Sequence, residues 1–293
     1  MSDARTLTLA LRGKWYRRFG LALCPAHGDR KPSLTLRDGD KGLIVKCHSG
    51  CDWRDVKEAL RDRGLIDSQH RPQPPNPSEI ARREAEDRAE AEKVERRALA
   101  TWNECHPIRG TIAETYLRGR GITCDLPDTL RFHPECWHPT AKRFPAMVAR
   151  IDGLPRLAIH RAYLRPDGSG KADVDPPKAM QGAASGGAVR LTQTQGPLVV
   201  AEGIETALSL SCGLLRAPAT VWAALSAPGI AALRLPDGFP HRLTIASDGD
   251  QAGREAAHKL AARADSLGWS VSLLPAPEGR DWNDILMMKG GKQ

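Results

Sequence analysis

The last third of the chain alternates short apolar runs with longer amphipathic stretches, which predicts alternating strands and helices. The apolar runs are continuous, as in strands that are buried on both faces. This βαβ order predicts a mainly parallel sheet with helices on its faces. We expect strands at residues 198–201, 220–225, 243–246 and 270–274, and helices at 204–215 and 252–266.

Carboxylates directly follow two of these predicted strands. Glu202 ends the first strand, and Asp248 and Asp250 form an Asp-Gly-Asp sequence after the third. Because the C-terminal ends of parallel strands share one edge of a sheet, we expect the three side chains to lie together there. Magnesium prefers oxygen ligands and often binds through one or two carboxylates plus substrate phosphates. This edge is therefore a candidate magnesium site.

A simpler interpretation of Asp248 and Asp250 is that they cap the helix that follows them. For Asp-Gly-Asp taken alone, capping would be the better explanation. The strand-terminal Glu202 favours a metal site, where two ions can stabilise the attacking and leaving oxygens of a phosphoryl transfer. Asp281 and Asp284 lie beyond the last predicted strand and are further candidate ligands.

Near the N-terminus, two tight turns carry cysteine and histidine. Cys24 and His27 form the first pair, and Cys47 and Cys51 form the second, with two short strand-like runs between the pairs. Soft thiolate and imidazole ligands at such spacing predict a structural zinc ribbon. His48 is the alternative to Cys47, because His48 has the commoner two-residue spacing to Cys51.

The segments around the ribbon predict its setting. Residues 14–19 interleave basic and aromatic side chains, which suits binding of a single nucleic-acid strand or a short helix that packs on the ribbon. A helix is expected from residue 53 to about residue 64. The proline-rich stretch 71–77 predicts a stiff spacer, and 79–100 a charged helix. Coiled-coil pairing of that helix is the second choice.

Residues 101–195 have a mixed pattern. We expect two helical pieces broken at Pro107, then strands at 130–132, 146–151 and 156–164. Lys171, Lys178 and Arg190 follow in a glycine-rich segment, and glycine lets the backbone approach a phosphate closely. This segment is a candidate for binding a nucleotide or a strand, with unpartnered surface cations as the alternative. The histidines between residues 133 and 138 do not have the spacing of a metal site.

The net charge of +8 is unevenly distributed. Residues 1–70 hold 14 Lys and Arg against 9 Asp and Glu, and residues 101–195 hold 13 against 9. Residues 196–293 hold 9 against 10. The positive first two-thirds suit contact with phosphate backbones, and the slightly acidic last third suits a cation site.

Composition also narrows the location. No apolar run approaches the roughly 20 residues that span a bilayer, and the N-terminus has no signal-peptide pattern. We therefore expect a cytoplasmic protein that does not contact a membrane. Seven cysteines without a secretory pattern make a disulfide framework unexpected.

The motifs resemble those of a known family. Glu202-Gly203 after one strand and Asp248-Gly249-Asp250 after another resemble the Toprim domain of bacterial-type primases, topoisomerases and nucleases. The Cys24 to Cys51 segment resembles the zinc ribbon of bacterial and phage primases. Together they resemble a DnaG-like DNA primase of the kind found in phages, plasmids and integrated elements.

The resemblance implies an α/β fold with a Toprim-like, mainly parallel sheet and flanking helices. A mixed α+β basic subdomain and an N-terminal zinc ribbon would precede it. The implied divisions are a zinc-ribbon DNA-binding module, a linker, the basic part of a primase core and a Toprim catalytic domain, at residues 1–66, 67–100, 101–195 and 196–293 respectively.

The resemblance also implies roles for individual residues. Glu202, Asp248 and Asp250 would hold catalytic Mg²⁺ or Mn²⁺, and Arg161 and Lys178 would contact nucleotide or template. The family often places an aspartate four residues after the glutamate. This chain has Thr206 there with Glu205 beside it, which leaves the role of Glu205 open.

We therefore expect a primase that makes short RNA primers on a single-stranded DNA template from ribonucleoside triphosphates, by metal-dependent nucleotidyl transfer. Zinc would be structural. No Walker motif is present, so a helicase partner would be a separate protein. The alternatives are a Toprim-type metal-dependent nuclease and a non-catalytic replication accessory protein that binds single-stranded DNA.

Overall fold

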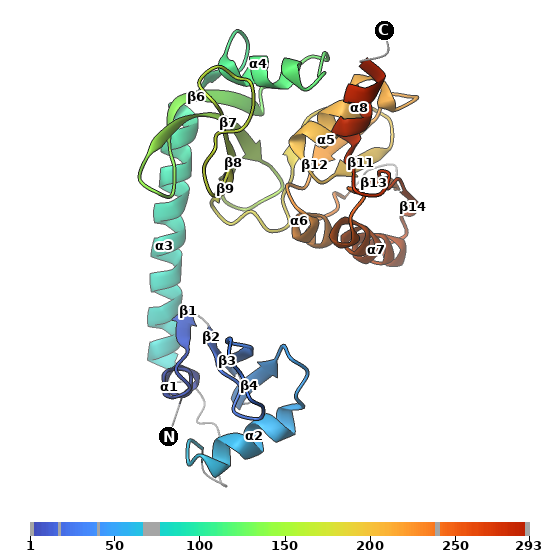
Figure 1. The fold of residues 1–293 in the computed structure, drawn as a ribbon. Helices are drawn as coiled ribbons and strands as arrows, with labels where there is room; N and C mark the ends of the chain where they lie inside the picture. Colours follow the sequence, from blue (N-terminus) through green and yellow to red (C-terminus); the bar gives the residue numbers. More distant parts are fainter. Residues whose placement is uncertain (1–2, 17–18, 40–41, 67–76, 238–240, 291–293) are drawn as a thin grey trace. The chain divides into compact units, whose positions relative to one another are not determined.

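The computed structural model describes residues 3–16, 19–39, 42–66, 77–237 and 241–290 (Figure 1). The chain divides into two compact units, Met1–Asp87 and Arg88–Gln293. Apart from Pro77, the predicted proline-rich spacer lies outside the described residues. The charged run after it forms the long helix α3 (Pro77–Asn103), as predicted. Within the described ranges, no helix combines the length and apolar character needed to cross a membrane.

A four-stranded antiparallel sheet forms the centre of the first unit, in the order β1-β2-β3-β4. Fully buried Leu7, Leu34, Leu36 and Leu60 close a small core on it. This core has few apolar side chains, so we expect it to be only marginally stable by itself. The elements of this unit are α1 (Ala4–Ala10), β1 (Lys14–Tyr16), β2 (Phe19–Ala22), β3 (Leu34–Gly39), β4 (Gly42–Cys47) and α2 (Trp53–Asp62).

The basic and aromatic segment belongs to strands β1 and β2, so the alternative of a short helix is wrong. Its side chains follow the two-residue period of a strand. Trp15 packs on the core, while Tyr16 and Phe19 pair across the hairpin with ring centroids 5.5 Å apart. Tyr16 is 42% exposed and Phe19 41%. The exposed ring pair is compatible with the predicted single-strand binding, which stays a prediction.

An antiparallel sheet of order β5-β6-β7-β8-β9 forms the first part of the second unit. One face of this sheet carries Tyr163 and Ile159 and packs on the end of α3. The other face carries Met147 and Ala162 and packs on α4 and on the following domain. The elements are β5 (His106–Pro107), α4 (Ile112–Gly119), β6 (Leu130–Trp137), β7 (Arg143–Ile151), β8 (Ala158–Tyr163) and β9 (Lys178–Gln181).

The last part of the chain forms a five-stranded sheet of order β10-β12-β11-β13-β14. Strands β11 to β14 are parallel, and β10 pairs antiparallel with β12 at one edge. The predicted mainly parallel sheet is therefore confirmed. Its strands are β10 (Val189–Arg190), β11 (Leu198–Ala201), β12 (Thr220–Ala223), β13 (Arg242–Ala246) and β14 (Ser270–Leu273).

Helices cover both faces of this sheet because its central strands are apolar on both sides. Val199 and Ala201 of β11 face α5, whereas Leu198 and Val200 face α6 and α7. Figure 1 shows α5 and α8 on one side and α6 and α7 on the other. The helices are α5 (Ile204–Ser209), which continues as the π-helical turn η1 (Leu210–Leu214), α6 (Ala227–Ala232), α7 (Gln251–Ser266) and α8 (Trp282–Gly290).

Helix α6 is additional to the helices expected in this part of the chain. The Ser226 hydroxyl caps it by accepting a hydrogen bond from the Gly229 N–H. Cys124 and Cys212 form a disulfide, although no disulfide framework was expected. They are 88 residues apart, and only the packing of α5 and η1 on the preceding domain brings them together.

Candidate metal centres

The parallel pairing of β11 and β13 brings two of the predicted carboxylates to one edge. Ala201 is opposite Ala246 in the register, so Glu202 and Asp248 leave the sheet from neighbouring strands. Both residues are half-buried. The expected meeting of the carboxylates at the C-terminal edge follows directly from this register.

Asp248 has the least compensated charge of the group. Its Oδ1 atom is buried and has no hydrogen-bond partner. Burial, together with the carboxylates of Glu202, Asp281 and Asp250, raises the pKa of Asp248 to about 7. The Lys178 ammonium opposes this shift. A buried oxygen without a donor among like charges is the environment that a cation would relieve.

Glu202 and Asp250 complete the group in different ways. Burial and the Asp250 charge raise the pKa of Glu202, while Lys178 and the main-chain N–H of Ala227 lower it. Asp250 is exposed and caps α7, because its Oδ1 accepts a 2.6 Å hydrogen bond from the Gly253 N–H. The capping interpretation is thus correct for Asp250, and its second oxygen is left for another role.

Gly249 allows the turn between the two aspartates to pack closely. A Cβ atom there would lie 1.9 Å from the Pro277 carbonyl oxygen. The Gly249 N–H donates to the Arg280 carbonyl, and its own carbonyl accepts from the Gly279 N–H and the Arg254 guanidinium. These bonds hold Asp248 and Asp250 on a rigid turn.

Asp281 and Asp284 have separate positions. They form a reciprocal capping box at the start of α8: the Asp284 N–H donates to Asp281 Oδ1 at 2.8 Å, and the Asp281 N–H donates to Asp284 Oδ2 at 3.2 Å. The Asp281 charge still acts on Asp248. Of Asp281 and Asp284, the two further candidate ligands, Asp281 is the one whose charge contributes to the raised pKa of Asp248.

The predicted cationic residues lie on opposite faces of their sheet. Lys178 of β9 pairs with Ala162 of β8, so it shares the face that packs toward the following domain. Arg161 is one position away and therefore on the other face. There its Nη1 donates to the Trp137 carbonyl at 2.8 Å. Of these two residues, Lys178 is the one whose charge acts on Glu202 and Asp248.

Two residues next to this edge were not recognised from the sequence. Tyr116 and Lys171 both contact the buried carboxylate of Glu205, with Oη and Nζ respectively at 2.6 and 2.8 Å from its Oε1. No local pattern predicts these contacts, because Tyr116 lies 89 residues from Glu205. Lys171 had been noted only as one cation of a glycine-rich segment.

The donor set at the edge fits a hard divalent cation. The oxygens come from Glu202, Asp248 and Asp250, and oxygen ligands with few protein donors suit Mg²⁺. The unpartnered Asp248 Oδ1 is the observation that supports the fit. Among the described side chains, these carboxylates are not drawn together as tightly as the cysteine and histidine group of the first unit.

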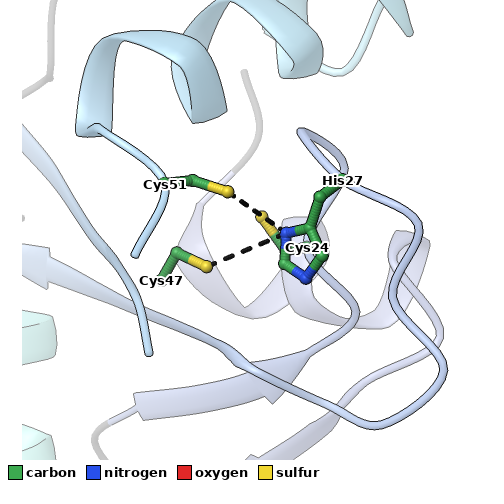
Figure 2. A group of neighbouring side chains, drawn as sticks. All are labelled: Cys24, His27, Cys47 and Cys51. Atoms are coloured by element: carbon green, nitrogen blue, oxygen red, sulfur yellow. Dashed lines mark hydrogen bonds between the residues drawn. The ribbon is translucent and has the colours of Figure 1, made fainter. Parts of the chain in front are cut away.

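The first unit contains a group of cysteine and histidine side chains (Figure 2). Cys24, His27, Cys47 and Cys51 have sulfur and nitrogen atoms that all lie within 4.8 Å of one another. His27 Nδ1 is 3.2 Å from the Cys51 sulfur and 4.0 Å from the Cys47 sulfur. Three soft sulfurs and one imidazole nitrogen are the donor chemistry of a structural zinc site.

The surrounding contacts decide how this group is held. His48 points elsewhere, since its Nε2 lies 2.8 Å from the Thr35 hydroxyl. The structure therefore brings Cys47, and not His48, to the other three residues. Asp29 supports the first turn: its Oδ2 accepts from the Cys24 N–H and the Ser33 hydroxyl, and its Oδ1 is 3.6 Å from His27 Nε2. A carboxylate on the second nitrogen is typical of metal-bound histidine.

His133 of β6 and His138, which follows this strand, make separate contacts. His133 Nε2 is 3.0 Å from Glu104, and His138 Nε2 is 3.0 Å from the Pro176 carbonyl. These two histidines thus have different hydrogen-bond partners.

Divalent-ion affinity at the carboxylate edge is predicted to depend on pH. The folded-state pKa of Asp248 lies above the ordinary aspartate value, so between about pH 4 and 7 the folded protein holds a proton that the unfolded chain has lost. Stability without the ion should fall as pH rises through this window, and ion binding, which needs the carboxylate, should strengthen. Calorimetric titration should give Mn²⁺ affinity about tenfold lower at pH 6 than at pH 8. Equal affinities at pH 6 and 8 would contradict the shift.

Two family models match consecutive ranges of the second unit. Residues 92–191 match a domain of unknown function, DUF7146. Residues 197–292 match the Toprim domain. No curated protein matches this chain.

Three solved structures show distant similarity. A DNA primase domain from Pseudomonas aeruginosa is 21% identical, with 62% of this chain and 68% of that chain covered and a TM-score of 0.39. The Aquifex aeolicus primase, with its zinc-binding and RNA polymerase domains, is 15% identical, with 98% and 80% covered and a TM-score of 0.42. The RNA polymerase domain of Mycobacterium tuberculosis primase DnaG is 17% identical, with 70% and 81% covered and a TM-score of 0.42.

The family match and the geometry agree on the last third of the chain. The matched range contains both strand-terminal carboxylate motifs and the parallel sheet that aligns them. The predicted Toprim domain is thereby confirmed for residues 197–292.

Proposed function

We propose that this chain is a DnaG-like DNA primase that makes short RNA primers on single-stranded DNA. The observation that carries the proposal is the unpartnered Asp248 oxygen at the carboxylate edge of a Toprim domain. The cysteine and histidine group in the same chain supports a primase over other Toprim enzymes, since primases of this family carry a zinc ribbon. The phage, plasmid or integrated-element origin stays a prediction.

At the proposed active site, Glu202, Asp248 and Asp250 would hold Mg²⁺ or Mn²⁺. Bound ions of this kind neutralise charge on a transferring phosphoryl group and stabilise the leaving oxygen. Lys178 is exposed on β9 and lies close enough to lower the pKa values of Glu202 and Asp248. We assign Lys178 to the triphosphate, where a flexible ammonium acts as a point charge for phosphate.

The first unit would bind the template. Cys24, His27, Cys47 and Cys51 would hold structural zinc, and the exposed rings of Tyr16 and Phe19 would stack on unpaired bases. The divisions at residues 66, 100 and 195 are proposed as the functional boundaries. The proposed partners are single-stranded DNA, ribonucleoside triphosphates and a separate helicase, in the cytoplasm.

Template-dependent incorporation of labelled ribonucleotides tests the proposal. The purified chain with Mg²⁺ or Mn²⁺ is expected to make short RNA on some members of a set of varied single-stranded DNA templates, and none without template or metal. Absence of RNA on every template would count against a primase.

The rival functions give different results in the same preparation. Metal-dependent strand cleavage without nucleotides would identify a Toprim nuclease. Salt-sensitive single-strand binding that persists when Asp248 and Asp250 are both changed to asparagine, without any synthesis by the unchanged chain, would identify an accessory binding protein.

A further inference from the structure

Glu205 is a buried carboxylate that the proposed metal site does not use. It lies on α5, three residues after Glu202, and is 8% exposed. A charged side chain at this depth is costly unless it is paired and hydrogen-bonded. Its contacts therefore indicate what it does.

Both strong contacts of Glu205 come from the domain that precedes the Toprim domain. Lys171 Nζ lies 2.8 Å from Glu205 Oε1, and the Tyr116 hydroxyl donates to the same oxygen at 2.6 Å. Tyr116 belongs to α4, and Lys171 to the segment between β8 and β9. One buried oxygen thus joins three parts of the second unit.

The charge of Glu205 is already balanced by the protein. Burial alone would raise its pKa, but the Lys171 ammonium and the Tyr116 hydroxyl outweigh burial and lower the pKa to about 2. Glu205 is therefore ionised at neutral pH with its partner cation in place. Asp248 differs, because its buried oxygen has no donor at all.

Lys171 and Lys178 both belong to the segment 164–181, which runs from the end of β8 through β9. Lys171 forms a β-bridge with Leu164, and Lys178 pairs with Ala162. Residues opposite one another in an antiparallel pair share a face, so both lysines lie on the face that packs toward the Toprim domain. Lys178 acts on Glu202 and Asp248 from this face.

The tip of the same segment is seated on α4. A Cβ atom at Gly168, whose φ is +72°, would lie 3.1 Å from the Ile112 carbonyl oxygen and the Thr115 side chain. The segment is thus held at two places, at Gly168 by packing on α4 and at Lys171 by its ion pair with Glu205. Lys178 lies seven residues after Lys171.

We propose that Glu205 is a positioning residue and not a metal ligand: by holding Lys171, its carboxylate fixes residues 164–181 so that Lys178 faces the Glu202 and Asp248 edge. The contact of Lys178 with nucleotide rests on the proposed function. The effect of Glu205 on residues 164–181, and its lack of effect on metal binding, do not rest on that function. Separate experiments therefore test the two parts.

The first experiment needs no enzyme activity. In the full chain, Glu205→Gln should leave Mn²⁺ affinity within about twofold of the unchanged protein, while amide exchange across 164–181 should accelerate at least about tenfold. Lys171→Met should have the same effect on exchange. Glu135→Gln, which breaks an exposed pair with Arg143, is the matched control and should change neither quantity. A loss of Mn²⁺ affinity in Glu205→Gln as large as in Asp248→Asn, or unchanged exchange, would overturn the proposal.

Lys171→Met leaves the buried Glu205 charge without its partner cation, and Glu205→Gln leaves the half-buried Lys171 charge without its carboxylate, so either single change can prevent folding. The double variant Glu205→Gln/Lys171→Met removes both charges, and Tyr116→Phe keeps the ion pair. Exchange in the double variant should be no faster than in either single variant, because the two residues act as one unit. Additive effects would show that they act separately and would overturn the proposal.

The second experiment uses primer synthesis. Glu205→Gln should raise the ribonucleotide KM about tenfold with kcat nearly unchanged, as expected when a charge-assisted phosphate contact is displaced. Lys171→Arg, which keeps the charge, should restore most of the affinity that Lys171→Met loses. A fall in kcat without a change in KM would overturn the link to Lys178. If the unchanged chain makes no primer, the proposed function fails while the metal and exchange results still decide the role of Glu205.

Discussion

Asp248→Asn is expected to abolish primer synthesis and divalent-ion binding without loss of folding. The substitution keeps the shape of the side chain but removes the charge that a cation would balance. Loss of even an outer-shell partner costs roughly 10- to 100-fold in metal affinity or activity, so loss of this carboxylate should cost at least about 100-fold. Labelled-ribonucleotide incorporation and Mn²⁺ titration measure the two effects.

The metal-free Asp248→Asn protein should melt no lower than the unchanged protein. Its carboxylate is destabilised by burial and by Glu202, Asp281 and Asp250, so removing the charge relieves repulsion. Asp265→Asn, on the exposed end of α7 in the same domain, is the matched control and should keep full activity. Activity retained in Asp248→Asn would refute the catalytic assignment, and a large fall in melting temperature would show that the loss is structural.

Removal of zinc is expected to unfold the first unit while the second unit stays folded. Cys24 and Cys47 are themselves part of the small core, so the proposed zinc ligands and the apolar packing form together. Structural zinc contributes about 10 kcal/mol or more in small metal-binding modules, which exceeds what a core of this size supplies. Amide exchange after chelation should become fast across residues 3–66 and stay slow in the Toprim domain.

Two single variants make the zinc prediction specific. Cys47→Ala should lower bound zinc and unfold the first unit, whereas His48→Ala should retain one zinc per chain, because His48 is bonded to Thr35 away from the other three residues. Metal analysis of both proteins decides between them. The reverse pattern would make His48 the ligand.

Local patterns were enough to predict most of the fold. The buried runs before Glu202 and Asp248 predicted strands β11 and β13. Because these runs are apolar without alternation, they required helices on both faces of the sheet. The spacing of the ligands in the turns at Cys24 and Cys51 likewise predicted the cysteine and histidine group. In each case the residues that make the chemistry are adjacent to the element that positions them.

Patterns could not choose between roles where a residue has two local uses. Asp250 and Asp284 suit both a helix cap and a metal ligand, and the contacts show both in caps. Arg161 and Lys178 both looked suited to phosphate, but strand pairing puts them on opposite faces of their sheet. The order of residues along the chain does not show which face of a sheet each side chain occupies.

Residue order alone was enough to predict a parallel sheet ending in Glu202 and Asp248, and a group of soft ligands near the N-terminus. Which carboxylate oxygen lacks a hydrogen-bond partner depends on the folded chain. Lys171 and Tyr116 balance the charge of Glu205, whereas Asp248 Oδ1 has no hydrogen-bond partner. A charge is compensated by groups that lie near it in space, and Tyr116 is 89 residues from Glu205 along the chain.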